Sequence, residues 1–133
     1  MMKVLIIESD WPFEAKATNY FESHADLVVH ATPANAVDRA RSWRPDLLIL
    51  AAEYATEELL KSLGMFEPAP AVLLTEHMSR FDRAWSAWQL GGDELLMKPI
   101  FHLHELRQAS ISAMKNAVVC PNWDQRETTA ISA

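Results

Sequence analysis

The stretch Leu47-Leu48-Ile49-Leu50 is apolar at every position. A strand with one face in water alternates apolar and polar residues, whereas a strand covered on both faces is apolar throughout. Strands of the second kind are typical of parallel sheets, because the helices that connect parallel strands pack on both sides. We therefore predict a fully buried strand over residues 47–50, at the centre of a parallel sheet.

Four other short apolar runs accompany this strand, and segments with helical periodicity separate the five. The runs lie at residues 4–7, 27–29, 71–74 and 94–97. Strands that alternate with helices are joined by right-handed crossovers and form a doubly wound sheet. We therefore expect a single α/β domain, with a five-stranded parallel sheet between two layers of helices.

Residues with capping and helix-breaking preferences mark the five predicted helices. Expected starts are Asp10, Thr32-Pro33, Thr56, Ser79 with Asp82 as a capping box, and about His102. Expected ends include Pro45, Gly64, Gly91-Gly92 and Ala117. In the last helix, Leu103, Leu106, Ser110 and Met114 recur at helical spacing.

The residues that follow the strands matter most, because ligands bind at the carboxyl ends of strands in sheets of this kind. They are Glu8, Ser9 and Asp10 after the first strand, Ala51, Ala52 and Glu53 after the third, Thr75, Glu76 and His77 after the fourth, and Lys98 with Pro99 after the fifth. Taken singly, Asp10 is a helix cap, Thr75 a satisfied hydroxyl and Lys98 a solvated cation. Their joint placement predicts a polar site at one edge of the sheet.

These residues carry a resemblance to a known family. Ile6-Ile7-Glu8-Ser9-Asp10 is similar to the acidic strand end of bacterial response-regulator receiver domains, and residues 44–50 resemble the approach to their phosphoacceptor. Thr75 matches the phosphate-binding hydroxyl of the family. The stretch from Gly91-Gly92-Asp93 to Lys98-Pro99 resembles the segment that leads to its invariant lysine and proline.

The resemblance covers residues 3 to about 118. It implies a CheY-like, flavodoxin-like three-layer fold with strand order 2-1-3-4-5. It also implies that Ala51 lies at the carboxyl end of the third strand, near Thr75 and Lys98. We assign residues 1–119 to this receiver-like domain and residues 120–133 to a polar tail or the start of a linker.

Departures from the family pattern bear on function. The family needs a carboxylate that attacks a phosphoryl group, and an adjacent acid that helps to hold Mg²⁺. The acceptor position here is Ala51, whose methyl group is no nucleophile, and Ser9 replaces the second of the paired acids, of which Glu8 is kept. Glu76 replaces a small residue beside the pocket, and Leu95 occupies the position of the aromatic switch residue.

We therefore expect a non-catalytic signalling domain that binds a partner protein or a second copy of itself. No cofactor is expected, and Mg²⁺ is expected to bind weakly at most. Lys98 should pair with Glu8, with Glu53 or Asp10 as the next candidates. Two alternatives stay open: a phosphoaccepting response regulator that uses an unusual acid, and an enzyme or small-ligand binder that reuses the acidic pocket.

The fourth predicted helix is the candidate interaction surface, because the resemblance implies partner contacts on the face of the fourth helix, fifth strand and fifth helix. The candidate interface residues are Phe81, Trp85, Trp88 and Leu95. The three aromatic residues form one stripe at helical spacing and are core residues if the stripe faces the sheet. Alternatively, the small residues Ala84 and Ala87 favour close packing of their own side of the helix on the sheet. This would turn Trp85 or Trp88 outward.

Composition narrows the partners further. The formal charge of −6 disfavours nucleic acids and anionic membrane surfaces. No apolar stretch approaches the roughly 18 residues of a membrane span. The single cysteine, Cys120, cannot form an intrachain disulfide, which favours a cytoplasmic setting.

Overall fold

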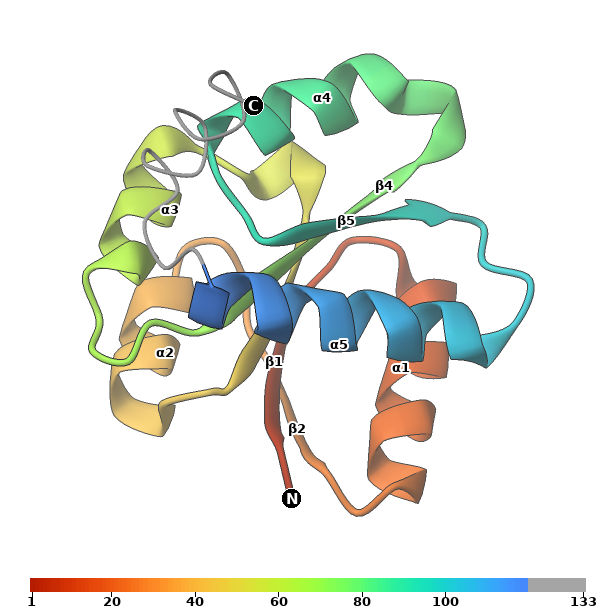
Figure 1. Cartoon of the computed structure of the whole chain (residues 1–133), viewed down its shortest axis with the longest axis horizontal. Coiled ribbons are helices and arrows are strands. Elements are labelled where there is room, and N and C mark those ends of the chain that lie inside the picture. The colour runs from red at the N-terminus through yellow and green to blue at the C-terminus, as the bar shows by residue number, and fades with distance from the viewer. Residues whose placement is uncertain (120–133) are drawn as a thin grey trace.

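The computed structural model describes residues 1–119 and has the predicted sheet at its centre (Figure 1). Its strands are β1 (Lys3–Ile7), β2 (Leu27–His30), β3 (Leu47–Ala51), β4 (Ala71–His77) and β5 (Glu94–Lys98). All neighbouring strands are parallel, in the order β2-β1-β3-β4-β5. The predicted topology and strand order are confirmed.

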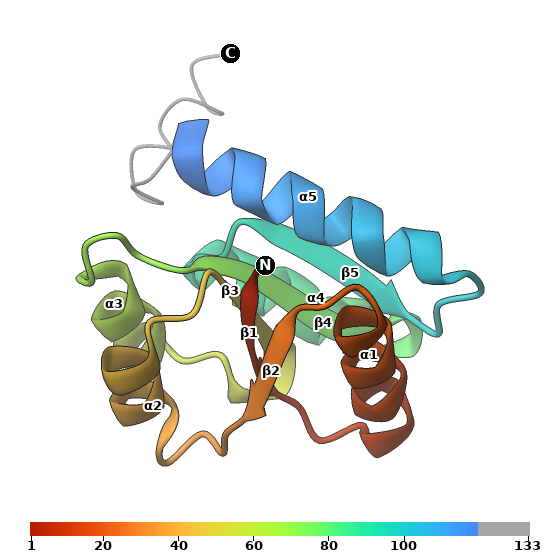
Figure 2. The ribbon, with the colours of Figure 1, turned by 90° about the horizontal axis from the view of Figure 1, so that it is seen from below.

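Helices cover both faces of this sheet, so the domain has three layers. The α-helices are α1 (Trp11–Ser23), α2 (Ala36–Trp43), α3 (Glu57–Gly64), α4 (Phe81–Leu90) and α5 (Leu103–Val119), and two 3₁₀ turns are η1 (Ala52–Tyr54) and η2 (Met78–Arg80). Helices α1 and α5 lie on one face of the sheet, opposite α2 and α3 (Figure 2). Helix α4 packs on the same face as α2 and α3.

Strand β3 lies at the centre of the core, as its apolar sequence predicts. Leu47 and Ile49 pack into the cluster beneath α1 and α5, whereas Leu48 and Leu50 pack into the cluster beneath α2, α3 and α4. All four side chains are completely buried. Each contributes about 1.5–3 kcal/mol of hydrophobic stabilisation, which anchors the sheet whose edge carries the site.

Two helix starts differ from their predictions. Helix α2 begins at Ala36 and not at Thr32-Pro33, because Asn35 closes a turn there by accepting a hydrogen bond from the Thr32 amide at 2.8 Å. The capping box at Ser79 is also wrong. Ser79 lies in η2, where its amide donates to His77 Nδ1 at 3.1 Å, and α4 starts two residues later with Arg80 as its N-cap residue.

The other element boundaries follow the sequence closely. Asp10 and Thr56 cap α1 and α3, with their side-chain oxygens 3.2 Å from the Phe13 amide and 3.1 Å from the Leu59 amide. The spacing predicted that Leu103 lies on the buried face of α5, but this residue is exposed. It is the first residue of the helix.

Two of the sequence predictions concern the ends and the surroundings of the domain. No helix within residues 1–119 combines the length and the apolar character needed to cross a membrane. The predicted tail or linker over 120–133, including Cys120, lies outside the described residues.

Candidate functional site

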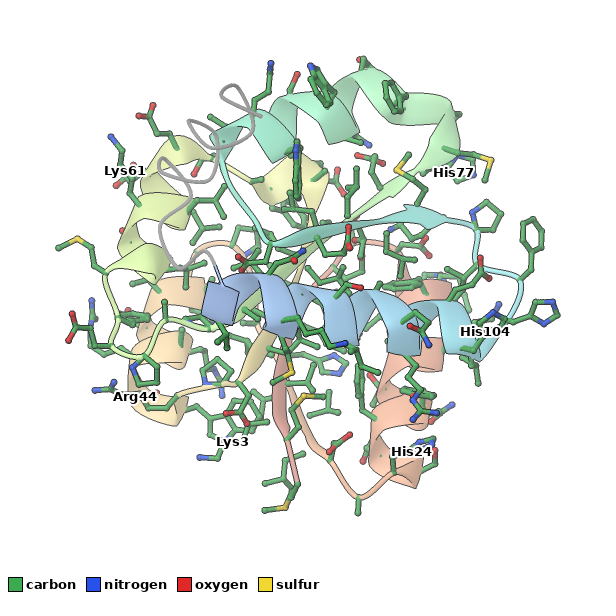
Figure 3. All side chains as sticks on the ribbon, viewed as in Figure 1. Lys3, His24, Arg44, Lys61, His77 and His104 are labelled. Atoms are coloured by element: carbon green, nitrogen blue, oxygen red, sulfur yellow. The ribbon has the colours of Figure 1, made fainter. Side chains whose placement is uncertain are left out.

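The predicted polar residues gather at the carboxyl edge of the sheet. Strand pairing sets Ala51 of β3 beside Thr75 of β4, and His77 of β4 beside Lys98 of β5. Figure 3 labels His77 at this edge, and Lys3, the first residue of β1, far from it at the opposite end of the sheet. The strands therefore bring together side chains that are up to 90 residues apart in the sequence.

Four of these residues form a polar group around a buried ion pair, which we call the inner group: Glu8, Asp10, Thr75 and Lys98. Lys98 Nζ lies 3.0 Å from Glu8 Oε1 and 3.4 Å from Asp10 Oδ2. Thr75 Oγ1 donates to the other carboxylate oxygen, Glu8 Oε2, at 2.6 Å. The predicted pairing of Lys98 with Glu8, and with Asp10 next, is confirmed.

The ion pair at the centre of the inner group is shielded from water. The side chains of Glu8 and Lys98 are 0% and 7% exposed. Charges removed from water to this extent are tolerated only when they are paired and hydrogen-bonded. The ammonium of Lys98 also lies 5.1 Å from the centre of the Phe13 ring, at a distance suited to a cation–π contact. Lys98 and Thr75 together thus occupy both oxygens of Glu8.

A second polar group forms the rim of the pocket, and we call it the outer group: Ser9, Glu53, Glu76 and Arg83. The Ser9 hydroxyl donates to Glu53. Arg83, on α4, donates two hydrogen bonds to Glu76: Nε donates to Oε2, and Nη2 donates to Oε1 at 3.1 Å. Its Nη1 lies 4.0 Å from Glu53 Oε2, so one guanidinium spans two acids. Glu53 thus contacts Ser9 and Arg83, and the proposed alternative pairing of Glu53 with Lys98 does not form.

The outer group holds Glu76 in its ionised form. Burial raises the pKa of this carboxyl, but the hydrogen bonds from Arg83 and from the His77 amide outweigh that effect and leave the pKa below its ordinary value. Glu76 raises the pKa of the Arg83 guanidinium in turn, mainly through the same hydrogen bonds. Both side chains, Glu76 and Arg83, therefore stay charged at physiological pH.

Arg83 is the site residue that the sequence reasoning missed. Four acids end up near the sheet edge, namely Glu8, Asp10, Glu53 and Glu76, whereas the strand ends supply a single lysine. This excess of negative charge was the available signal, because buried acids require a cation. Arg83 lies seven residues after Glu76 on the next helix, where pairing by the strands does not reveal it.

The position that corresponds to the phosphoacceptor carries no reactive group. Ala51 ends β3 and is 3% exposed, with only a methyl side chain. Nothing at Ala51 can attack a phosphoryl group, since nucleophilic transfer needs a carboxylate, hydroxyl or similar group.

The residues present do not fit the Mg²⁺ site that the receiver resemblance implies. Ser9 offers a hydroxyl that already donates to Glu53, and Glu8 is occupied by Lys98 and Thr75. Mg²⁺ needs carboxylate oxygens in near-octahedral geometry. Within residues 1–119, no three His, Cys, Asp or Glu side chains are grouped so as to hold a metal ion.

Helix α4 also carries three of the four candidate interface residues, and the fourth, Leu95, lies on β5. Its buried residues are Ala84 and Ala87, whereas Phe81 and Trp85 are 63% and 51% exposed. The expectation that Trp85 or Trp88 turns outward is thus confirmed for Trp85. Trp88 is half-buried and packs against the core beneath α2 and α3, as does Leu95. The predicted aromatic stripe therefore divides between surface and core.

Comparisons with known proteins rest on structure alone. No protein-family model and no curated protein sequence matches the chain. A two-component response regulator from Clostridium difficile has a TM-score of 0.69 and 18% identity over 86% of this chain and 97% of that one. The signal receiver domain of a modulated diguanylate cyclase from Desulfovibrio desulfuricans G20 has a TM-score of 0.71 and 18% identity, over 89% and 98%. NtrX from Brucella abortus has a TM-score of 0.72 and 14% identity, over 98% of this chain and 30% of that one.

At identities of 14–18%, the likeness concerns the course of the backbone. It agrees with the strand order β2-β1-β3-β4-β5 and with the helices on both faces of the sheet. The chain has the flavodoxin-like fold of response-regulator receiver domains.

Proposed function

We propose that this chain is a receiver-like signalling domain that acts through protein contacts without phosphorylation on the usual aspartate. One observation carries the proposal: Ala51 stands at the acceptor position at the end of β3, beside Thr75. The inner group supports it, because Lys98 is neutralised by Glu8 instead of being available to a phosphoryl oxygen. We propose neither an enzymatic activity nor a cofactor, and Mg²⁺ binds weakly at most. A cytoplasmic location is part of the same proposal.

Labelling with a small phosphodonor tests this function. The wild-type chain should take up no phosphoryl group, as measured by intact mass. Ala51→Asp should restore labelling poorly, because Ser9 cannot replace a metal-binding acid, and Ala51→Asp with Ser9→Asp should restore more. Ser9→Asp alone is the matched control and should remain unlabelled. Labelling of the wild-type chain to the level of the double variant would refute the proposal and favour a relocated acceptor such as Asp10 or Glu53.

The alternative of a small-ligand site has less support. The cavity beside the inner group is lined by Asp10, Phe13, Lys16, Lys98 and neighbouring residues, and its volume is about 110 Å³. Sites for drug-sized ligands are usually about 300–1,000 Å³. In a thermal-shift screen, nucleotides should give no stabilisation because the cavity is too small. Metals and small anions should give none either, because Glu8 and Lys98 already neutralise each other.

The surface of α4 is the part that we propose to contact a partner protein or a second copy. Exposed tryptophan is enriched at binding hot spots, and Trp85 with Phe81 one turn earlier forms an exposed aromatic pair. Sedimentation velocity over a range of concentrations tests self-association through this surface. Trp85→Ala should weaken it, whereas Trp11→Ala removes an even more exposed tryptophan from α1 and should not. A wild-type chain that is monomeric throughout would exclude the second copy and leave a different protein as the partner.

A further inference from the structure

Helix α4 has fewer large side chains completely buried against the sheet than α1 has. Its buried residues are two alanines, Ala84 and Ala87, while the partly buried Trp88 packs against the core and the N-cap residue, Arg80, makes no side-chain capping hydrogen bond. By contrast, α1 buries Phe13 and Phe21, and its N-cap side chain is bonded. Hydrophobic stabilisation scales with the apolar area removed from water, so two methyl groups and one partly buried indole hold α4 less firmly than two buried phenylalanines hold α1. Polar contacts can therefore contribute to the position of α4.

Arg83 supplies such contacts in the first turns of the helix. Its guanidinium binds Glu76 at the end of β4 with two hydrogen bonds and approaches Glu53, in η1 after β3. Two-donor pairing of arginine with a carboxylate fixes direction as well as distance. Glu76 is itself held by the His77 amide, whose nitrogen lies 2.8 Å from Oε1. Three hydrogen bonds therefore orient the Glu76 carboxylate.

The same residue sets which way the aromatic pair faces. Phe81 and Trp85 lie two residues before and two residues after Arg83, and residues two apart in a helix point to different sides. With Arg83 directed at the pocket, both aromatic rings are directed at solvent, in agreement with their exposure. A rotation of α4 that moved the aromatic pair would have to break the bridge.

We propose that Arg83 is a positioning residue: its bridge to Glu76 and Glu53 fixes α4, and with it the Phe81–Trp85 surface, in one conformation relative to the pocket. The inference rests on the proposed function of that surface and adds how the surface is held in place. Arginine stays charged at every physiological pH, so deprotonation of Arg83 does not break the bridge. The surface is thus held in one state without a phosphoryl group.

Hydrogen–deuterium exchange on the full chain tests the bridge in the absence of any partner. In Arg83→Ala, amides of α4 should exchange about tenfold faster, as expected for the loss of hydrogen bonds between charged groups. Amides of α1 and α5 should keep their wild-type rates. Glu76→Gln cuts the same bridge from the other side and should raise exchange in the same helix.

Arg80→Ala is the matched control, because Arg80 pairs with Asp82 on the exposed side of the same helix. It should leave exchange in α4 unchanged. Unchanged α4 exchange in Arg83→Ala, an equal rise in Arg80→Ala, or a rise spread evenly over α1 and α5 would each overturn the inference. Phosphodonor labelling of the wild-type chain would refute the proposed function without affecting this result, so the two failures are distinguishable.

Discussion

The inner and outer groups of the pocket hold similar charges in different surroundings. The inner group contains a buried ion pair of Glu8 and Lys98 with Asp10, 37% exposed, beside it. In the outer group Glu76 is buried, but the Arg83 and Glu53 side chains that it shares charge with are 34% and 33% exposed. Charge interactions strengthen in the interior and are screened near the surface. We therefore expect the inner group to contribute mainly to the stability of the fold. We expect the outer group to contribute mainly to the position of α4.

Removing the cation of the inner group should have the largest effect. Lys98→Ala leaves the buried carboxylate of Glu8 without its ammonium partner, and breaking a buried pair in this way costs about 3–5 kcal/mol of unfolding free energy. Urea unfolding measures the loss. Adding Glu8→Gln to Lys98→Ala should recover part of it, because the unpaired charge is then gone.

Lys115→Ala, which removes an exposed lysine from α5, is the control and should change stability little. If Lys98→Ala proved as mild as Lys115→Ala, the inner group would not be the stabilising half of the pocket.

The next largest effect should come from the hydroxyl of the inner group. Thr75→Val keeps the shape of a fully buried side chain but removes the donor to Glu8 Oε2. Hydrogen bonds to charged groups contribute about 1.5–3 kcal/mol, so the unfolding free energy should fall by that amount. Ser42→Ala removes an exposed hydroxyl that bonds to the Arg39 carbonyl and should cost far less. Equal losses in the two variants would mean that Glu8 does not need Thr75.

The sequence predicted the inner group better than the outer group, for a physical reason. Residues of the inner group lie within three positions of strand ends, and parallel strands must bring their ends to one edge. Arg83 reaches the pocket from the first turn of α4, and its direction depends on how that helix is rotated. The failed capping box at Ser79 shows the same limit, since η2 inserts a turn of 3₁₀ helix before α4 and shifts its start.

The fold itself was predictable because short, largely apolar runs alternate five times with segments of helical periodicity, although only β1, β3 and β4 are mostly buried. The rotation of α4 was only partly predictable, from its alanines. Ala84 and Ala87 indicated the side that packs on the sheet, and this side is buried. Successive residues of a helix are turned by about 100°, so Trp85 and Trp88 point in different directions. Trp88 packs against the core cluster, whereas Trp85 is exposed.

The contribution of Glu76, in the outer group, to the unfolding free energy should depend on pH, because its pKa is depressed. Because the pKa of Glu76 is lower in the folded chain than in the unfolded chain, its contribution to stability is complete above the ordinary glutamate value of about 4.3 and is lost as pH falls through the folded value. The gap in unfolding free energy between wild type and Glu76→Gln should be constant at neutral pH and narrow below about pH 4. A gap that widened in acid would contradict the sign of this shift. The charged groups that face Glu76 are Arg83 and, at longer range, Lys98.

The smallest effect on stability should come from the exposed aromatic pair. Trp85 is half exposed on the outer side of α4, so Trp85→Ala removes little buried surface and should change the unfolding free energy by no more than about 0.5 kcal/mol. Trp88→Ala is the internal comparison, because the Trp88 side chain packs against the core cluster and its loss should cost clearly more. Thermal unfolding of both variants measures the difference. If Trp85→Ala destabilised the chain as much as Trp88→Ala, Trp85 would be part of the folded core, and a loss of association in that variant would report unfolding instead of a surface contact. A nearly unchanged melting temperature allows the association experiment to be interpreted, since the surface of α4 is then altered on an intact fold.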